Sequence, residues 1–190
     1  MAADPPVAGL VLAGGGGTRL GRAKAGVVMR GRTLVERAVD AVGARCEPVV
    51  VVSRPGVLLP TLDVPVVLDR EGARGPMNAL ATGLSQVDAE DVLVLACDLP
   101  FAGPVLDRLL AVPPGLAVAA ADARPQPLCA RYPRTAALDA CERLIARGVR
   151  RMTTLLDELE ATTVAVEGDE LFNVNTADDL ERARLRAPTG

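Results

Sequence analysis

The chain has 190 residues, of which 49% are hydrophobic and 2% aromatic, and its formal net charge is −3 at pH 7. This length is enough for one domain with a sizeable core. The negative net charge and the scarcity of aromatic rings disfavour both double-stranded and single-stranded nucleic acid as partners. We therefore expect no nucleic-acid partner. No apolar run reaches membrane-spanning length, so we also expect no membrane association.

The chain contains four cysteines and no histidine. The cysteines form no Cys-x-x-Cys pair, which disfavours a structural zinc site, and they suggest no disulfide framework. The first residues lack the basic segment that begins a signal peptide, so we expect a cytoplasmic protein. Without histidine, neither a Ser-His-Asp nor a Cys-His centre is available. Any catalysis must therefore use carboxylates, a metal ion, cations and backbone amides.

The apolar segment 8–13 predicts a buried strand, and four consecutive glycines follow it at 14–17. Glycines let the backbone turn sharply and direct N–H groups at an anion. Lys24, a few residues further on, is the only lysine among 21 cationic residues. A flexible ammonium beside a glycine loop is typical of a phosphate contact. The alternatives are a chance position for the lysine and an ordinary strand-to-helix turn for the glycines.

Two familiar phosphate-binding loops do not fit this segment. The Walker A pattern requires a lysine directly after its last glycine, but Arg22 follows Gly21. The dinucleotide-binding pattern Gly-x-Gly-x-x-Gly fits the glycine run in no register. The loop therefore predicts a phosphate cradle of another kind.

Strand and helix patterns alternate along the rest of the chain. Thr33 and Glu36 form a capping-box pattern before a helix at 34–43. Prolines open two further helices, which begin at 76 and at 104. The other predicted helices are 135–146, 152–159 and one from about 176 to 185. The other predicted strands are 48–53, 64–68, 92–96, 116–121, 128–132 and 162–166.

This alternation predicts an α/β fold, a single domain with a mostly parallel twisted sheet and helices on both faces. Such sheets bind ligands beyond the carboxyl ends of their strands. The glycine loop, Asp69 and Asp98 each follow directly on a predicted strand. We therefore expect them to meet at one rim of the sheet.

Carboxylates and amides at this rim are candidates for metal and substrate contacts. Mg²⁺ is typically held by one or two carboxylates plus substrate phosphates, which suits Asp98. A turn or a cap for the helix at 104 is the alternative, and Asp69 occupies a strand end where Asp is common. Asn173 and Asn175 alternate in an extended segment and so share one face. They suit polar recognition or support of a metal, unless they only form the turn before Thr176.

Together these segments resemble the nucleotidyltransferase family that includes molybdenum cofactor guanylyltransferase. The family's opening, Leu-Ala-Gly-Gly-x-x-x-Arg-Met-Gly-x-Asp-Lys, is similar to residues 12–24. Its Asp-x-Pro-Phe/Tyr segment is similar to 98–101, its Gly-Pro helix start to 75–76, and its Asn-Val-Asn-Thr segment to 173–176. The four motifs occur in the family's order and span nearly the whole chain. The resemblance implies a Rossmann-like nucleotidyltransferase fold.

The resemblance also implies an activity: Mg²⁺-dependent transfer of GMP from GTP to the phosphate of molybdopterin, with release of pyrophosphate. A nucleotide half would span about 8–101 and an acceptor half about 102–185. Proteins that mature molybdoenzymes would be further partners. Attack by a phosphate monoester needs no general base, so the reaction does not require the missing histidine.

The implied site residues fall into three groups. The backbone at Leu12, Ala13, Gly14 and Gly15 would meet the nucleotide, together with Asp69. Lys24, Asp98 and Arg19 would be catalytic: Lys24 would bind the phosphates, and Asp98 would contact the nucleotide and hold Mg²⁺. Asn173 and Asn175 would support the acceptor or the metal.

Two positions depart from the family's pattern. Ala23 stands where an acidic residue usually precedes the lysine, and Gln126 replaces the histidine of a His-Pro segment. They leave two alternatives open: transfer with another nucleotide or phosphorylated acceptor, such as cytidylyl transfer, or a catalytically weak nucleotide-binding adaptor. The Ala-Gly-Gly sequence at 13–15 and the Gly-Pro pair at 75–76 are similar to the guanylyl branch and favour GTP.

Overall fold

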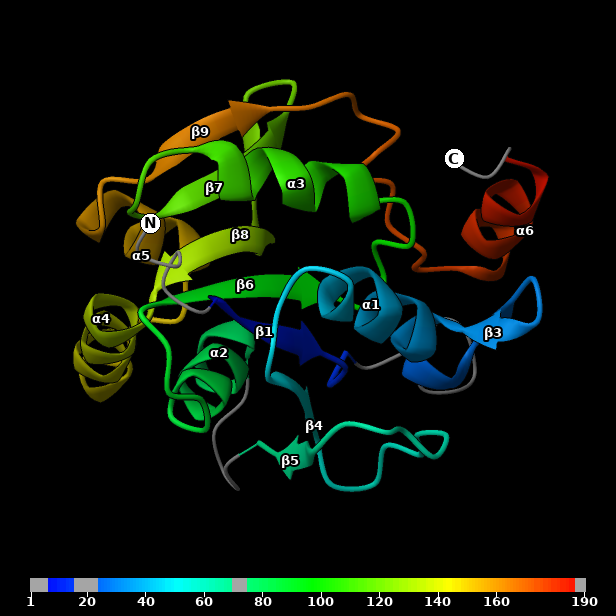
Figure 1. The fold of residues 1–190 in the computed structure, drawn as a ribbon, viewed down its shortest axis with the longest axis horizontal. Coiled ribbons are helices and arrows are strands. Elements are labelled where there is room, and N and C mark those ends of the chain that lie inside the picture. Colours follow the sequence, from blue (N-terminus) through cyan, green and yellow to red (C-terminus); the bar gives the residue numbers. More distant parts are fainter. Residues whose placement is uncertain (1–6, 16–23, 70–74, 187–190) are drawn as a thin grey trace, which may run out of the picture.

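The computed structural model describes residues 7–15, 24–69 and 75–186. Its main element is a seven-stranded sheet with the strand order β5-β4-β1-β6-β8-β7-β9 (Figure 1). The strands of this sheet are β1 (Val7–Leu12), β4 (Val49–Ser53), β5 (Val66–Leu68), β6 (Asp91–Ala96), β7 (Ala117–Ala121), β8 (Arg124–Pro133) and β9 (Thr162–Ala165). A separate hairpin joins β2 (Val28–Met29) and β3 (Arg32–Thr33). The predicted strands are thus confirmed, while the hairpin was not predicted.

The described part of the chain contains six α-helices, of which five lie between strands and α6 follows β9. They are α1 (Leu34–Gly43), α2 (Pro76–Leu84), α3 (Gly103–Ala111), α4 (Arg134–Ala146), α5 (Met152–Glu158) and α6 (Ala177–Leu185). The predicted capping box is confirmed at α1, where Thr33 Oγ1 accepts from the Glu36 N–H and the Glu36 carboxylate accepts from the Thr33 N–H. None of these helices is long and apolar enough to cross a membrane.

The sheet is mixed: six of its strands run in the same direction, and β8 alone among the seven runs against them. β5, β4, β1 and β6 run parallel to one another, whereas β8 is antiparallel to both β6 and β7. The reversal arises at a two-residue turn between β7 and β8. Both turn residues, Asp122 and Ala123, have a positive φ, as a tight hairpin requires. The prediction of a mostly parallel sheet with helices on both faces is confirmed (Figure 1).

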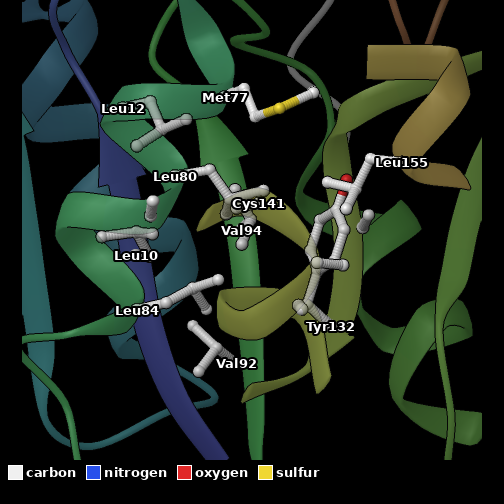
Figure 2. Packing of buried hydrophobic residues seen from close by; sticks show 14 of the residues in the cluster. Leu10, Leu12, Met77, Leu80, Leu84, Val92, Val94, Tyr132, Cys141 and Leu155 are labelled. Atoms are coloured by element: carbon white, nitrogen blue, oxygen red, sulfur yellow. The ribbon is translucent and has the colours of Figure 1, made fainter. Parts of the chain in front are cut away.

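Alternation along each buried strand sends side chains to two cores. Leu10 and Leu12 of β1 face the core formed with α2, α4 and α5, while Val11 faces the core formed with α1 and α3. In Figure 2, Leu10, Leu80 and Leu84 lie together between β1 and α2. The central strands are therefore buried on both faces, which explains their continuous apolar sequence.

Gly83 lets α2 approach β1 closely. A Cβ at this position would lie 2.3 Å from Leu10 Cδ1 and 2.5 Å from Leu10 Cδ2, so a side chain does not fit without a shift. Leu10 is completely buried and has little space to move. The spacing between α2 and β1 depends on this glycine. The position of α2 beside the rim at the carboxyl end of β1 depends on it as well.

We predict that Gly83→Ala destabilises the protein by about 1–3 kcal/mol, because overpacking forces Leu10 or α2 to shift. Gly103→Ala is the matched control, since a Cβ on Gly103 of α3 meets nothing within 4 Å. Urea denaturation of both variants measures the effect. Equal stability of the two variants would contradict this account of the α2–β1 contact.

Candidate functional site

A pocket lies at the carboxyl ends of the parallel strands, as expected for this type of sheet. It opens over the ends of β4, β1 and β6, and Lys24 is one of the residues that line it. The lining residues are Leu12, Gly14, Gly15, Lys24, Val52, Ser53, Arg54, Asp69, Gly75, Pro76, Ala79, Ala96, Cys97, Asp98 and Leu128. The expectation that the glycine loop, Asp69 and Asp98 meet at one rim is confirmed for Gly14 and Gly15, the two glycines of the loop that the structure describes.

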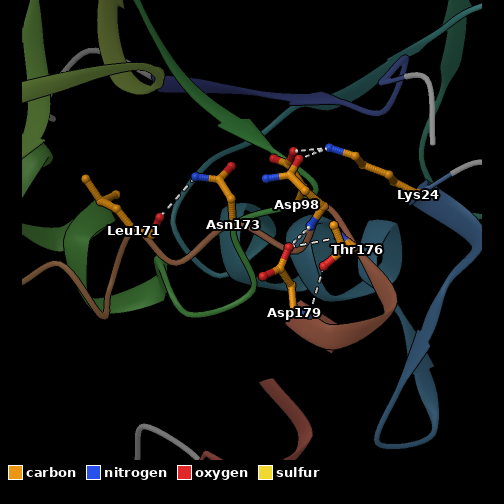
Figure 3. A network of polar contacts seen from close by, with 7 residues as sticks. Lys24, Asp98, Leu171, Asn173, Thr176 and Asp179 are labelled. Atoms are coloured by element: carbon orange, nitrogen blue, oxygen red, sulfur yellow. Dashed lines mark hydrogen bonds and ion pairs between the residues drawn. The ribbon is translucent and has the colours of Figure 1, made fainter. Parts of the chain in front are cut away.

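Lys24 is held by two acceptors from distant parts of the chain. Its Nζ lies 3.0 Å from Asp98 Oδ2 and also donates to Asn175 Oδ1 (Figure 3). The Lys24 side chain is only 14% exposed and that of Asp98 only 20%, so water screens the pair weakly. The ion pair thus places a cation and a carboxylate side by side on the pocket wall.

Asp98 follows β6 and is held by backbone hydrogen bonds. The Cys97 N–H donates to Leu12 O at 3.1 Å, which ties the end of β6 to the end of β1. The Asp98 carbonyl accepts from the Val174 N–H at 2.9 Å. Asp98 does not cap α3, because the N-cap of that helix is Ala102 and makes no side-chain cap bond. The alternative of a capping aspartate is therefore wrong, whereas Asp98 does lie in a turn, which the Leu99 N–H closes by donating to Ala96 O.

Asn175 is positioned by the start of α6. Asp179 Oδ2 accepts from the backbone N–H of Asn175 at 3.0 Å and from that of Thr176 at 2.9 Å, while Thr176 Oγ1 accepts from the Asp179 N–H (Figure 3). Thr176, and neither asparagine, is the N-cap of α6. Asn173 instead donates to the carbonyl of Leu171 at 3.2 Å. The structure therefore brings Asn175, but not the amide of Asn173, to Lys24.

Asp69 occupies the other end of the pocket. Its backbone N–H donates to Ser53 O at 2.7 Å, and its carboxylate accepts from Thr82 Oγ1 of α2 at 3.1 Å. The residue is only 5% exposed. A carboxylate this buried, and held by both β4 and α2, is fixed in orientation.

The first two residues of the glycine loop, Gly14 and Gly15, follow the end of β1 and line the pocket, while Gly16 and Gly17 lie outside the described residues. The Ala13 N–H donates to Val52 O at 2.8 Å, so it belongs to the strand ladder. A Cβ on Gly15 would lie 3.8 Å from Lys24 Cδ, which puts the loop backbone against the lysine stem. Arg19 and Ala23 lie outside the described residues.

Ser53 and Arg54 line the pocket, although the sequence analysis did not single them out. They occupy the end of β4, next to the end of β1. The signal that identified Asp69 and Asp98, a polar residue directly after a buried strand, was present here as well.

Comparison with known proteins identifies the family. Residues 9–162 match the family model described as the MobA-like NTP transferase domain. The chain belongs to this family. It is 37% identical, over 185 residues, to a protein of Mycobacterium tuberculosis named probable molybdenum cofactor guanylyltransferase, and the match covers 92% of both chains.

Solved structures support the same assignment of the fold. The molybdopterin-guanine dinucleotide biosynthesis protein A from Archaeoglobus fulgidus superposes with a TM-score of 0.76 and 26% identity, over 94% of this chain and 97% of that one. The M. tuberculosis protein Rv0371c, solved in complex with manganese, has a TM-score of 0.69 and 20% identity, over 96% and 100% of the two chains. The part of this chain that matches the family model ends before Asn175, the second acceptor of the Lys24 ammonium.

Cys97 also lines the pocket of this MobA-like domain, but it is not suited to act as a nucleophile. Burial raises the pKa of its thiol to about 12, and the neighbouring Asp98 carboxylate acts in the same direction. The thiolate is the reactive form, so the group is inert near neutral pH. The same cause raises the pKa of Cys46 to about 11 and those of Cys129 and Cys141 to about 12.

We predict that the folded protein reacts slowly with a thiol reagent such as Ellman's reagent at pH 8, because all four cysteines are free, buried and protonated. Unfolding in guanidinium chloride should expose all four to rapid reaction. One fast thiol in the native protein that is lost in Cys97→Ser would show that Cys97 is open to the pocket and would contradict the assignment of an inert wall.

Proposed function

We propose that this chain transfers GMP from GTP to the phosphate of molybdopterin, yielding the guanine dinucleotide form of the cofactor and pyrophosphate. The observation that carries the proposal is the Lys24–Asp98 pair beside a glycine loop, at the strand-end rim of a MobA-like NTP transferase domain. The name of the M. tuberculosis relative supports guanylyl transfer to the molybdenum cofactor.

The nucleotide would lie along the rim. We assign contacts with the base and ribose to the backbone at 12–15, as the family resemblance implies, and to Asp69, which follows β5 at the end of the pocket opposite Asp98. Lys24 would contact the phosphates, since an ammonium pairs well with phosphate oxygens. Arg19, which follows the glycine loop, would assist it. The acceptor half, about 102–185, would hold molybdopterin.

Asp98 would hold Mg²⁺. A single carboxylate is sufficient, because Mg²⁺ keeps several waters and takes further ligands from substrate phosphates. This matches the described residues, which contain no group of three or more acidic, His or Cys side chains able to hold a metal. Bound Mg²⁺ would neutralise charge on the transferring phosphate. The manganese bound by the fold neighbour Rv0371c supports a divalent ion in this fold.

Lys24 would exchange partners when the nucleotide binds. Its ammonium pairs with Asp98, while Asn175 offers a second, neutral acceptor. An ammonium has three donors, so it can keep the amide contact while it turns toward a phosphate oxygen. Asn175 would thus hold the lysine at the rim after Asp98 has engaged the metal.

The transfer itself requires positioning and charge neutralisation. A phosphate oxygen of molybdopterin attacks the α-phosphorus of GTP in line with the leaving group. A new P–O bond forms, the anhydride bond between the α- and β-phosphates breaks, and pyrophosphate leaves with the electron pair. The attacking oxygen is already anionic near neutral pH, so no general base is needed. The absence of histidine is compatible with this chemistry.

We place the reaction in the cytoplasm, together with partners that receive the product, such as proteins that mature molybdoenzymes. Four free, buried cysteines are typical of proteins from reducing compartments and support this location.

We predict that the purified protein, with Mg²⁺, GTP and molybdopterin, releases pyrophosphate and forms the guanine dinucleotide, with little turnover of CTP or ATP. Asp98→Asn should lower turnover roughly 100-fold or more, because it removes the carboxylate charge at the metal position. Pyrophosphate release and product formation are measured together.

Asp139→Asn is the matched control, because Asp139 is exposed on α4. Full activity of Asp98→Asn would contradict the metal assignment. Preferred use of CTP would replace guanylyl by cytidylyl transfer. Tight nucleotide binding without turnover of any nucleotide would leave the adaptor alternative.

A further inference from the structure

We propose that Arg54, supported by Ser53, selects the base of the nucleotide by donating to the O6 and N7 edge of guanine. This inference rests on the proposed use of GTP and extends it to the residue that recognises the base.

Two polar groups at the end of β4 are covered but have no partner among the described residues. Ser53 is 1% exposed, and its Oγ makes no hydrogen bond there; the Arg54 Nε is buried and likewise makes none. Both residues line the pocket. Buried donors without partners are unfavourable and rare, and a ligand that supplies acceptors would satisfy them.

The Arg54 side chain has a defined position on the pocket wall. Its stem lies against Gly14, where a Cβ would come within 3.0 Å of Arg54 Cγ and 3.7 Å of Nε. The Ser53 carbonyl accepts from the Asp69 N–H, which fixes the backbone just before Arg54. The absence of a side chain at Gly14 therefore leaves the guanidinium room beside the glycine loop.

The strand order separates Arg54 from the phosphate end of the pocket. Lys24 pairs with Asp98 after β6, while Arg54 follows β4, on the other side of β1. Neighbouring strands lie about 4.8 Å apart, so the ends of β4 and β6 are separated by roughly 10 Å. A nucleotide with its phosphates at Lys24 and its backbone contacts at the glycine loop would therefore place its base near β4.

Guanine offers the acceptors that an arginine fork requires. Its O6 and N7 lie side by side and accept two parallel N–H bonds, a geometry that a lysine does not reproduce. Adenine carries an amino donor where guanine has O6, and cytosine lacks this pair of acceptors. Arg54 would therefore favour guanine over both bases.

The test measures dissociation constants, in Mg²⁺ without acceptor, for GTP, ITP, 7-deaza-GTP, ATP and CTP. ITP keeps O6 and N7, whereas 7-deaza-GTP lacks N7. For the wild type we expect GTP and ITP to bind on the order of tenfold more tightly than 7-deaza-GTP and ATP. Arg54→Lys should weaken GTP and ITP on the order of tenfold, leave CTP within about twofold, and close the gap between GTP and 7-deaza-GTP.

Arg143→Lys on the exposed face of α4 is the matched control and should leave all five constants unchanged. Ser53→Ala should weaken GTP more than CTP. If Arg54→Lys weakens the binding of all five nucleotides equally, Arg54 is a phosphate contact and the inference is overturned. Unchanged dissociation constants in Arg54→Lys would also overturn it. The wild-type comparison of GTP with 7-deaza-GTP does not depend on how the variants fold. A wild type that prefers CTP would instead count against the proposed function.

Discussion

The ammonium of Lys24 joins three segments that are far apart in the sequence. It meets Asp98 after β6 and Asn175 before α6, and it lies beside the glycine loop that follows β1. Because both ionic side chains are largely buried, their attraction is stronger than that of a surface pair, and loss of either partner would leave an uncompensated charge. This contact therefore links the elements that form the Asp98 end of the rim.

A small apolar cluster places the three segments. Val27, Phe101 and Val174 are buried together, and each lies within three residues of a member of the polar contact: Lys24, Asp98 and Asn175 respectively. The cluster also contains Met29 and Leu34 from the hairpin and α1, and Leu180 and Ala183 from α6. Phe172 packs against this cluster, and the guanidinium carbon of Arg186 lies over the Phe172 ring, 4.0 Å from its centre. Burial of these apolar side chains supplies a non-directional force that brings the three segments together. The Lys24 hydrogen bonds then fix how the Lys24, Asp98 and Asn175 side chains are oriented.

The parts of the site that sequence could predict are those set by local rules. Residues that end buried parallel strands meet at one rim whatever the details of packing, so Asp69 and Asp98 were placed correctly. The capping box at Thr33 depends on residues three apart and was equally visible. The contact between Lys24 and Asn175 was not predicted, because it depends on how α6 packs against the hairpin, and two-residue strands such as β2 have too short a pattern to detect. Ser53 and Arg54 carried the strand-end signal, but they belong to none of the motifs in the family resemblance.

The central claim is that Lys24 and Asn175 act as one unit in nucleotidyl transfer. A double-mutant cycle with Lys24→Met and Asn175→Ala, read out as kcat/KM for GTP, tests it directly. The account predicts that Asn175→Ala lowers kcat/KM on the order of tenfold in the wild type but less than about twofold in Lys24→Met, because methionine has no donor for the amide oxygen to hold. Equal effects of Asn175→Ala in both backgrounds would contradict the claim.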